Sequence, residues 1–167
     1  MNGRSVRTAS LGRLAAGAVG VASALALLSA RATPSPGALV PVAGASASAP
    51  TYEIAAGKGQ ATLLLNPGTG SPEAALSRLV LRGGAQVPEH VHEHSAELLY
   101  VVRGEIVVHI EARAIVLKAG DAVRIPAGQK HAGSVPPAIE QAELVQIYVG
   151  PGPEQRFTAG RRLDSRR

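Results

Sequence analysis

Short apolar runs, each bounded by glycine or proline, fill the middle of this 167-residue chain. Each run is about as long as one β-strand, and none shows a long 3.6-residue period with helix caps. The runs cover residues 61–65, 76–82, 96–102, 105–111, 114–118, 122–125 and 143–149. Consecutive short strands at this spacing favour an antiparallel sandwich or barrel, so we predict an all-β fold.

The run 105–111 shows the expected pattern of a half-buried strand most clearly. Ile106, Val108 and Ile110 alternate with residues that include His109. Because successive side chains of a strand point to opposite faces, the three isoleucine and valine side chains are expected on the core side. His109 is therefore expected to face solvent.

The first 32 residues have the three parts of a secretory signal peptide. Residues 1–13 carry three arginines, and residues 14–28 are apolar and uncharged. Ala30 and Ala32 supply small side chains at the two positions that a signal peptidase reads. The alternative is a retained membrane anchor, but the apolar part is shorter than the ~20 residues that a spanning helix needs. We expect an exported protein, periplasmic or extracellular, that keeps no stable membrane anchor after cleavage near Thr33.

Three further segments follow from composition. Residues 33–50 contain four prolines and no charge, which predicts an unstructured linker. Residues 51–160 are then the folded domain. Residues 161–167 carry four arginines against one aspartate. We expect this basic C-terminal tail to be solvated and dispensable for folding.

The net charge of +5 does not indicate a nucleic-acid partner. The basic excess lies at the two ends, whereas residues 33–160 carry nine basic and eleven acidic side chains. A nucleic-acid-binding domain would gather its basic residues on one folded face. The chain also lacks cysteine, so any metal must be held by nitrogen and oxygen atoms.

Four residues carry the candidate chemistry: His90, His92, Glu97 and His131. His90 and His92 lie two apart on an extended segment, so both imidazoles are expected on the same face. Three imidazoles and a carboxylate suit one divalent transition metal ion, with Fe, Mn, Ni, Cu and Zn all compatible. Two neighbouring histidines alone are a moderate signal, because histidine-rich surface loops also occur.

The residues around this set resemble the two motifs of the cupin superfamily. The first motif is matched in spacing by Gly84, His90, His92, Glu97 and Gly104, and the second by Gly120, Pro126, Gly128 and His131. Val135 stands where the second motif has asparagine. The resemblance covers about residues 51–157 and implies a small double-stranded jelly-roll barrel. It also implies a metal ion held by the three histidines and Glu97, although some cupins have lost such ligands and bind no metal.

Other polar and aromatic residues near the motifs are expected to play smaller parts. His94 is read as exposed or near the site without binding the metal, and Glu89 and Glu93 as solvated carboxylates. Tyr100 lies on the face of its strand opposite Glu97 and is expected to pack. Phe157 is expected to dock the segment 151–157 on the barrel.

Two functional hypotheses remain open. The first is an exported mononuclear metal cupin that acts on a small organic molecule, by dioxygenase-type chemistry resembling quercetin dioxygenase, with Glu97 detaching as a catalytic base. Hydrolysis, isomerisation and lyase reactions use the same set of ligands. The second is a non-catalytic protein that binds or senses a metal or small ligand. Polar groups converging beyond the metal ligands would favour the enzyme. In either case we expect a homodimer formed through edge strands.

Overall fold

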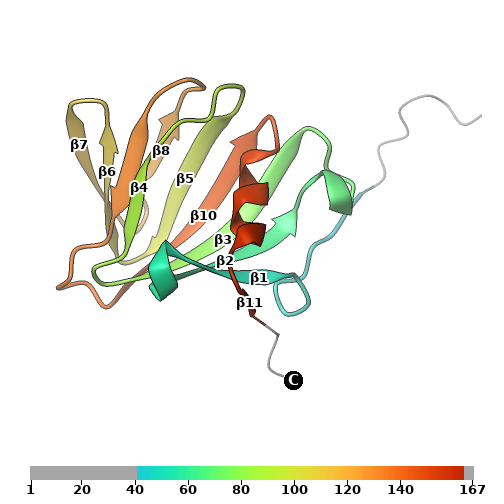
Figure 1. Cartoon of the computed structure of the whole chain (residues 1–167), viewed down its shortest axis with the longest axis horizontal. Helices are drawn as coiled ribbons and strands as arrows, with labels where there is room; N and C mark the ends of the chain where they lie inside the picture. The colour runs from blue at the N-terminus through green and yellow to red at the C-terminus, as the bar shows by residue number, and fades with distance from the viewer. Residues whose placement is uncertain (1–40, 164–167) are drawn as a thin grey trace, which may run out of the picture. The chain divides into compact units, whose positions relative to one another are not determined.

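A computed structural model describes residues 41–163, which form strands and three short 3₁₀ helices (Figure 1). The predicted signal peptide, the first part of the predicted linker and residues 164–167 lie outside the described residues. The elements are β1 (Thr51–Ile54), η1 (Ala55–Gly57), β2 (Gly59–Leu65), η2 (Pro67–Thr69), β3 (Ala74–Arg82), β4 (Gln86–His90), β5 (Ala96–Arg103), β6 (Glu105–Ile110), β7 (Arg113–Lys118), β8 (Ala122–Ile125), β9 (His131–Ser134), β10 (Gln141–Val149), η3 (Pro153–Ala159) and β11 (Arg162–Leu163). No helix within 41–163 is long and apolar enough to cross a membrane.

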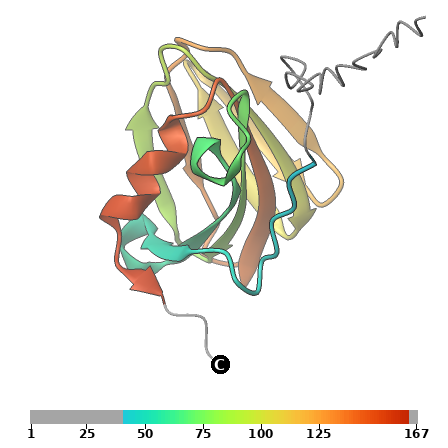
Figure 2. The same cartoon turned by 90° about the vertical axis from the view of Figure 1, so that its right-hand side faces the viewer.

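The described strands pair into two antiparallel sheets (Figures 1 and 2). The larger sheet has the order β11-β1-β2-β3-β10-β5-β8, and the smaller has the order β4-β9-β6-β7. Strands that are distant in sequence, such as β3 and β10, are neighbours within a sheet, because the chain passes back and forth between the two sheets. The predicted all-β jelly-roll fold is confirmed.

The core lies between the inward faces of the two sheets. Burial alternates along β3 and β10, as the half-buried strand pattern requires. The larger fully buried aliphatic side chains come from both sheets: Leu81, Val101, Val108, Ile125 and Leu144. Phe157, from η3, joins this cluster with 6% of its surface exposed, so the expectation that it docks the C-terminal segment is confirmed.

The turn between β5 and β6 requires glycine. Gly104 has a φ of +80°, which L residues with a side chain rarely adopt. A Cβ at this position would also collide with the backbone carbonyl of Gln141, at the start of β10. The first motif therefore ends at a point where the chain leaves the larger sheet and enters the smaller one.

The strands that composition missed are short or polar. The seven predicted runs correspond to β2, β3, β5, β6, β7, β8 and β10, with ends shifted by up to two residues. β4 contains Pro88 and Glu89, and β9 has the sequence His-Ala-Gly-Ser, so neither shows an apolar run. Both strands carry histidines of the candidate site. They are polar because their residues line this site and do not pack into the aliphatic core.

The C-terminal boundary of the folded domain lies beyond residue 160. β11 pairs with β1, in the register Thr51↔Leu163 and Tyr52↔Arg162. The backbone N–H of Glu53 donates to the Arg161 carbonyl at 2.9 Å, and the Arg161 guanidinium donates to the Glu53 carboxylate at 2.6 Å. The expectation that the tail is solvated from residue 161 onward is therefore corrected. Two residues of edge strand are too few to produce a periodic signal.

The described end of the predicted linker also contacts the domain. Residues 46–48 form a turn, and the Ala49 N–H donates to the Ala45 carbonyl at 2.9 Å. The Pro50 carbonyl accepts from the N–H of Leu63 on β2. Residues 41–48 are exposed and contain no strand or helix, as the composition predicts.

We predict that β11 contributes measurably to stability. Truncation after Gly160 should lower the free energy of unfolding by about 1–2 kcal/mol relative to truncation after Leu163, since it removes edge-strand hydrogen bonds and the partner of Glu53. Urea unfolding of the two truncated proteins measures the difference. Identical midpoints would show that β11 adds nothing to the domain.

Candidate metal centre

His90 and His92 reach the interior because the chain is extended where they lie. His90 is the last residue of β4, and His92 follows in the next loop. Val91, between them, is 36% exposed and points away. The two-residue period expected from the sequence therefore places both imidazoles in the same cluster.

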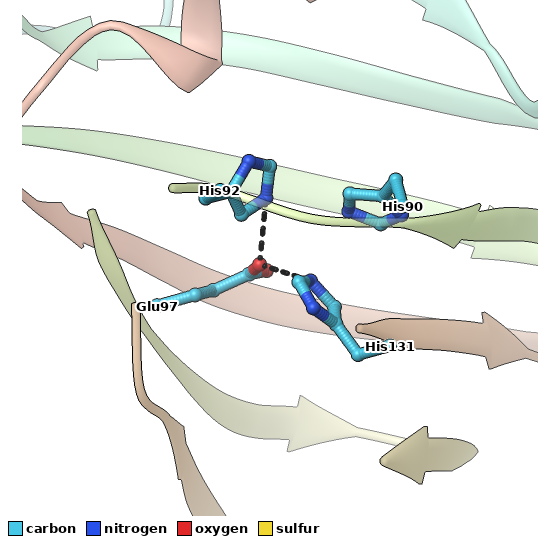
Figure 3. A group of neighbouring side chains, drawn as sticks. All are labelled: His90, His92, Glu97 and His131. Carbon is cyan, nitrogen blue, oxygen red and sulfur yellow. Dashed lines mark hydrogen bonds and ion pairs between the residues drawn. The ribbon is translucent and has the colours of Figure 1, made fainter. Parts of the chain in front are cut away.

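His131 and Glu97 approach this pair from two directions (Figure 3). His131 begins β9 and lies opposite His90 in the register between β4 and β9. Glu97 comes from β5 in the larger sheet, where it lies between Tyr148 of β10 and Ile125 of β8. The cluster thus forms where the two sheets face each other.

The four predicted ligands form a compact buried group. One potential ligand atom from each residue lies within 4.8 Å of all the others. The Glu97 Oε2 atom is 3.0 Å from His131 Nε2 and 3.3 Å from His92 Nε2. His92, Glu97 and His131 are buried, and His90 is half-buried.

The tautomers of two histidines are set by backbone carbonyls. The Nδ1–H of His90 donates to Pro88 at 2.7 Å, and the Nδ1–H of His131 donates to Gln129 at 2.9 Å. Such bonds leave Nε2 facing the interior, as metal-binding histidines require.

The Nε2 of His90 is buried and has no hydrogen-bond partner among the described residues. A buried imidazole nitrogen without a partner, beside two others and a carboxylate, fits a divalent transition metal ion. The cluster could therefore hold one.

Burial and hydrogen bonds shift the pKa values of three of these groups. Burial lowers the pKa of His90 to about 4, so this imidazole is neutral near pH 7. Burial alone would raise the pKa of Glu97, but hydrogen bonds with His131, His92 and Gln146 hold it well below its usual range. Burial alone would lower the pKa of His131, but its hydrogen bonds to Glu97 and the Gln129 carbonyl raise it.

Two polar residues of β10 extend the site beyond the predicted ligands. The Nε2 of Gln146 donates to Glu97 Oε1 at 2.6 Å and to the Tyr148 hydroxyl at 2.9 Å. Gln146 Oε1 and the hydroxyl of Ser77, which lies opposite Gln146 on β3, are buried and without a hydrogen-bond partner in the described part of the chain. A polar glutamine among the inward positions of β10 was the signal that sequence reasoning did not use.

A cavity of about 520 Å³ opens in front of the cluster. It is lined by His90, Glu97, His131 and Gln146 at the polar side and mainly by aliphatic side chains elsewhere. Arg156, from η3, also lines it, and its Nη1 lies 3.3 Å from His92 Nε2. Sequence reasoning missed Arg156, because only the folded chain brings η3 to this cavity.

Other residues near the motifs lie outside the four-residue cluster. His94, His109, Glu89 and Glu93 are among them and are exposed, as expected. Tyr100 does lie on the face opposite Glu97, but it is 47% exposed, so the expected packing is not found within the described residues.

Val135, at the motif's asparagine position, is fully buried in the core. Its backbone accepts from Gly84 at 2.9 Å and donates to Ala85 at 3.0 Å. The position therefore joins the end of the second motif to the start of the first, and the hydrophobic side chain does not disturb the ligand set.

Comparisons with known proteins agree with this architecture. Residues 77–147 match the family model described as a cupin domain, in agreement with the resemblance to the cupin superfamily that the two motifs carry. Its structure is similar to a predicted oxalate decarboxylase from Thermotoga maritima, with a TM-score of 0.58 and 23% identity over 65% of this chain and 98% of that one. The polyketide cyclase RemF from Streptomyces resistomycificus also gives a TM-score of 0.58, with 18% identity over 69% of this chain and 82% of the other. Likeness at this level establishes the fold.

Two curated sequences are similar over a shorter stretch. Polyketide synthase CurC from Streptomyces cyaneus and the tetracenomycin polyketide synthase protein TcmJ from Streptomyces glaucescens are each 31% identical over 74 residues, or 44% of this chain. The chain spans about half the length of these relatives, 48% and 50% respectively.

We predict that each histidine of the cluster is needed for tight metal binding. His90→Ala, His92→Ala and His131→Ala should each abolish it, while Glu97→Ala should weaken it less, because water can replace one carboxylate oxygen. His94→Ala and His109→Ala are matched controls and should keep about one metal ion per chain. Zinc titration of the six variants measures this. Loss of metal in His94→Ala with retention in His90→Ala would place the site elsewhere.

We also predict that metal binding displaces a proton. The raised pKa of His131 favours its protonated form in the metal-free protein, and binding at Nε2 requires the neutral imidazole. Apparent zinc affinity should therefore fall as the pH is lowered from about 8 to about 6, by up to tenfold per pH unit. Calorimetry in buffers of different ionisation enthalpy measures the proton count. An affinity independent of both pH and buffer would contradict this coupling.

Proposed function

We propose that this protein is a mononuclear metal-dependent enzyme that acts on a small, largely apolar organic molecule. The observation that carries the proposal is that three residues of the cluster, His90, Glu97 and His131, line the polar side of the cavity. Ligand sites of this kind are concave, mostly apolar and supplied with a few converging polar groups. A cavity of about 520 Å³ is large enough for a molecule of one to three fused rings.

The residues around the cluster are suited to controlling protons and orientation. A divalent transition metal bound there would act as a Lewis acid on an oxygen atom of the bound molecule. Gln146 holds one oxygen of Glu97, and His131 and His92 hold the other. These bonds keep the carboxylate ionised, which makes it a weak base for as long as they persist. The catalytic role of Glu97 stays a prediction that requires at least one of them to break.

The polar groups beyond the ligands favour an enzyme over a storage or sensor protein. Gln146 lines the cavity and donates to both Glu97 and the Tyr148 hydroxyl, and Ser77 lies opposite Gln146 on β3. The names of CurC and TcmJ support a polyketide-type carbon skeleton as the substrate. RemF, which shares the fold, is named a polyketide cyclase, so cyclisation is one reaction to test beside dioxygenation. The aliphatic remainder of the cavity lining supports the second candidate, non-catalytic ligand binding.

Export and dimerisation remain part of the proposal. Export rests on the composition of residues 1–32. A homodimer is supported by exposed apolar side chains on the larger sheet, Tyr100 and Val102 of β5 and Val149 of β10. Mass spectrometry of the mature N-terminus and light scattering of the purified protein test the two points separately.

The central experiment is metal analysis followed by turnover. Protein purified without chelator should contain about one transition metal ion per chain, and His131→Ala should lack it. The metal-loaded protein is then incubated with aromatic polyketide-type compounds under air. A product that gains two oxygen atoms supports dioxygenation, and one that loses water supports cyclisation. Equal turnover by wild type and His131→Ala would overturn the metal-dependent enzyme, and tight ligand binding without any turnover would favour the second candidate.

We predict that Gln146→Leu lowers kcat without lowering metal content. The substitution removes the hydrogen bond to Glu97 Oε1 but leaves all four ligand side chains in place. Removing a hydrogen bond to a charged group should cost roughly tenfold or more in rate, if the bond orients the carboxylate during turnover. Gln60→Leu, at an exposed position of β2, is the matched control. Unchanged kcat in Gln146→Leu would remove this residue from the site's chemistry.

A further inference from the structure

We propose that Arg156 receives an anionic oxygen of the substrate, so that the preferred substrates are apolar ring compounds carrying a carboxylate, phenolate or enolate. This inference rests on the proposed function, because it assigns a substrate class to the same cavity. The side chain of Arg156 lines the cavity and comes from η3 instead of from the two sheets.

The backbone that presents Arg156 is anchored on both sides. Phe157 is packed into the core, and Glu154 is fully buried. The Glu154 carboxylate accepts from the Gly152 N–H at 2.6 Å and from the Gln155 side chain at 3.1 Å. η3 also packs against β1, as Figure 2 shows. The guanidinium is therefore presented at the cavity by a fixed segment, although Arg156 itself is exposed.

Arg156 is the single arginine or lysine among the described residues that line the cavity. The acidic residues of the lining do not neutralise it. Glu53 is paired with Arg161, and Glu97 is engaged by His131, His92 and Gln146. Within residues 41–163, no carboxylate lies at ion-pair distance from Arg156, and Glu89 is exposed. The guanidinium thus brings an uncompensated positive charge to an otherwise mainly aliphatic space.

Besides lying 5.0 Å from the centroid of the Phe157 ring, the Arg156 guanidinium makes one polar side-chain contact within residues 41–163, and metal binding would end it. Its Nη1 lies 3.3 Å from His92 Nε2, which is the atom that His92 turns toward the cluster. When His92 Nε2 carries the proton that it donates to Glu97, it cannot accept from Arg156; when it is unprotonated, its one lone pair is the acceptor, since a guanidinium can only donate hydrogen bonds. A metal ion bound by that lone pair and the guanidinium cannot both use it. In the metal-loaded protein the N–H groups of Arg156 are therefore available to another acceptor.

The surroundings favour an anionic oxygen on an apolar body, and the proposed function supplies a ring compound as that body. Leu79, Leu99, Ile106 and Val108 offer the body of a ligand only dispersion contacts and the hydrophobic effect. A guanidinium in such surroundings binds an anionic oxygen more strongly than a neutral one. The positive charge also disfavours amines and other cations. Carboxylate, phenolate and enolate share this chemistry, and the probes below separate them.

The test uses the full-length, zinc-loaded protein and matched aromatic probes. Naphthoate and naphthol represent a carboxylate and a phenol, and naphthamide is the uncharged counterpart of naphthoate. Calorimetry should show naphthoate binding at least about tenfold more tightly than naphthamide to the wild-type protein. Arg156→Met should remove most of this preference while leaving zinc content and naphthamide affinity unchanged, and Arg156→Lys should retain part of it. Arg103→Met, at an exposed position of β5, is the matched control.

Each outcome bears on the proposal directly. Naphthol binding that tightens with pH as the phenol ionises, and does so only with Arg156 present, would extend the site to phenolates. Binding of naphthoate and naphthamide with equal affinity, or a preference that survives in Arg156→Met, would overturn the assignment while leaving the metal-dependent function intact. Failure of naphthoate to bind the zinc-loaded protein would overturn it as well. An Arg156-dependent preference in a protein that binds no metal would instead keep the anion site and reject the proposed function.

Discussion

The buried carboxylate of Glu97 is the interaction on which the arrangement of the site depends. It is 3% exposed and lies between two sheets, where an unpaired charge would cost several kcal/mol. Its two oxygens are instead contacted by His131 and His92 from one side and Gln146 from the other. These contacts link β9 and the loop after β4 to β5 and β10, so the same group that could bind a metal also joins the two sheets.

The carboxylate network also explains why the protonation states of the histidines differ. His90 makes no contact with Glu97 at ion-pair distance among the described pairs, and burial lowers its pKa to about 4. His131 is equally part of the cluster, but its bond to Glu97 raises its pKa. Contact with a buried anion therefore raises the pKa of one imidazole, while burial without that contact lowers the pKa of another.

The larger part of the fold could be predicted from short-range patterns. Period-two alternation marks runs such as β3 and β10 because one face of each packs on the core. The same reasoning failed for β4 and β9, whose residues serve the site, and for β11, whose two residues gain their conformation from β1. The local sequence pattern predicts a strand when the strand is stabilised by burial of its own apolar side chains. It does not predict a strand that is stabilised mainly by pairing with a neighbouring strand.

The sequence by itself determined the candidate ligand set, because His90, His92, Glu97 and His131 belong to motifs with defined spacing. It also determined the all-β class, through the alternation and length of its apolar runs. Only the tertiary structure decided that Gln146 supports Glu97 from 49 residues away and that Arg156 meets His92 across 64 residues. Neither contact has a local signal, since each arises when strand register and the packing of η3 bring distant segments to one cavity.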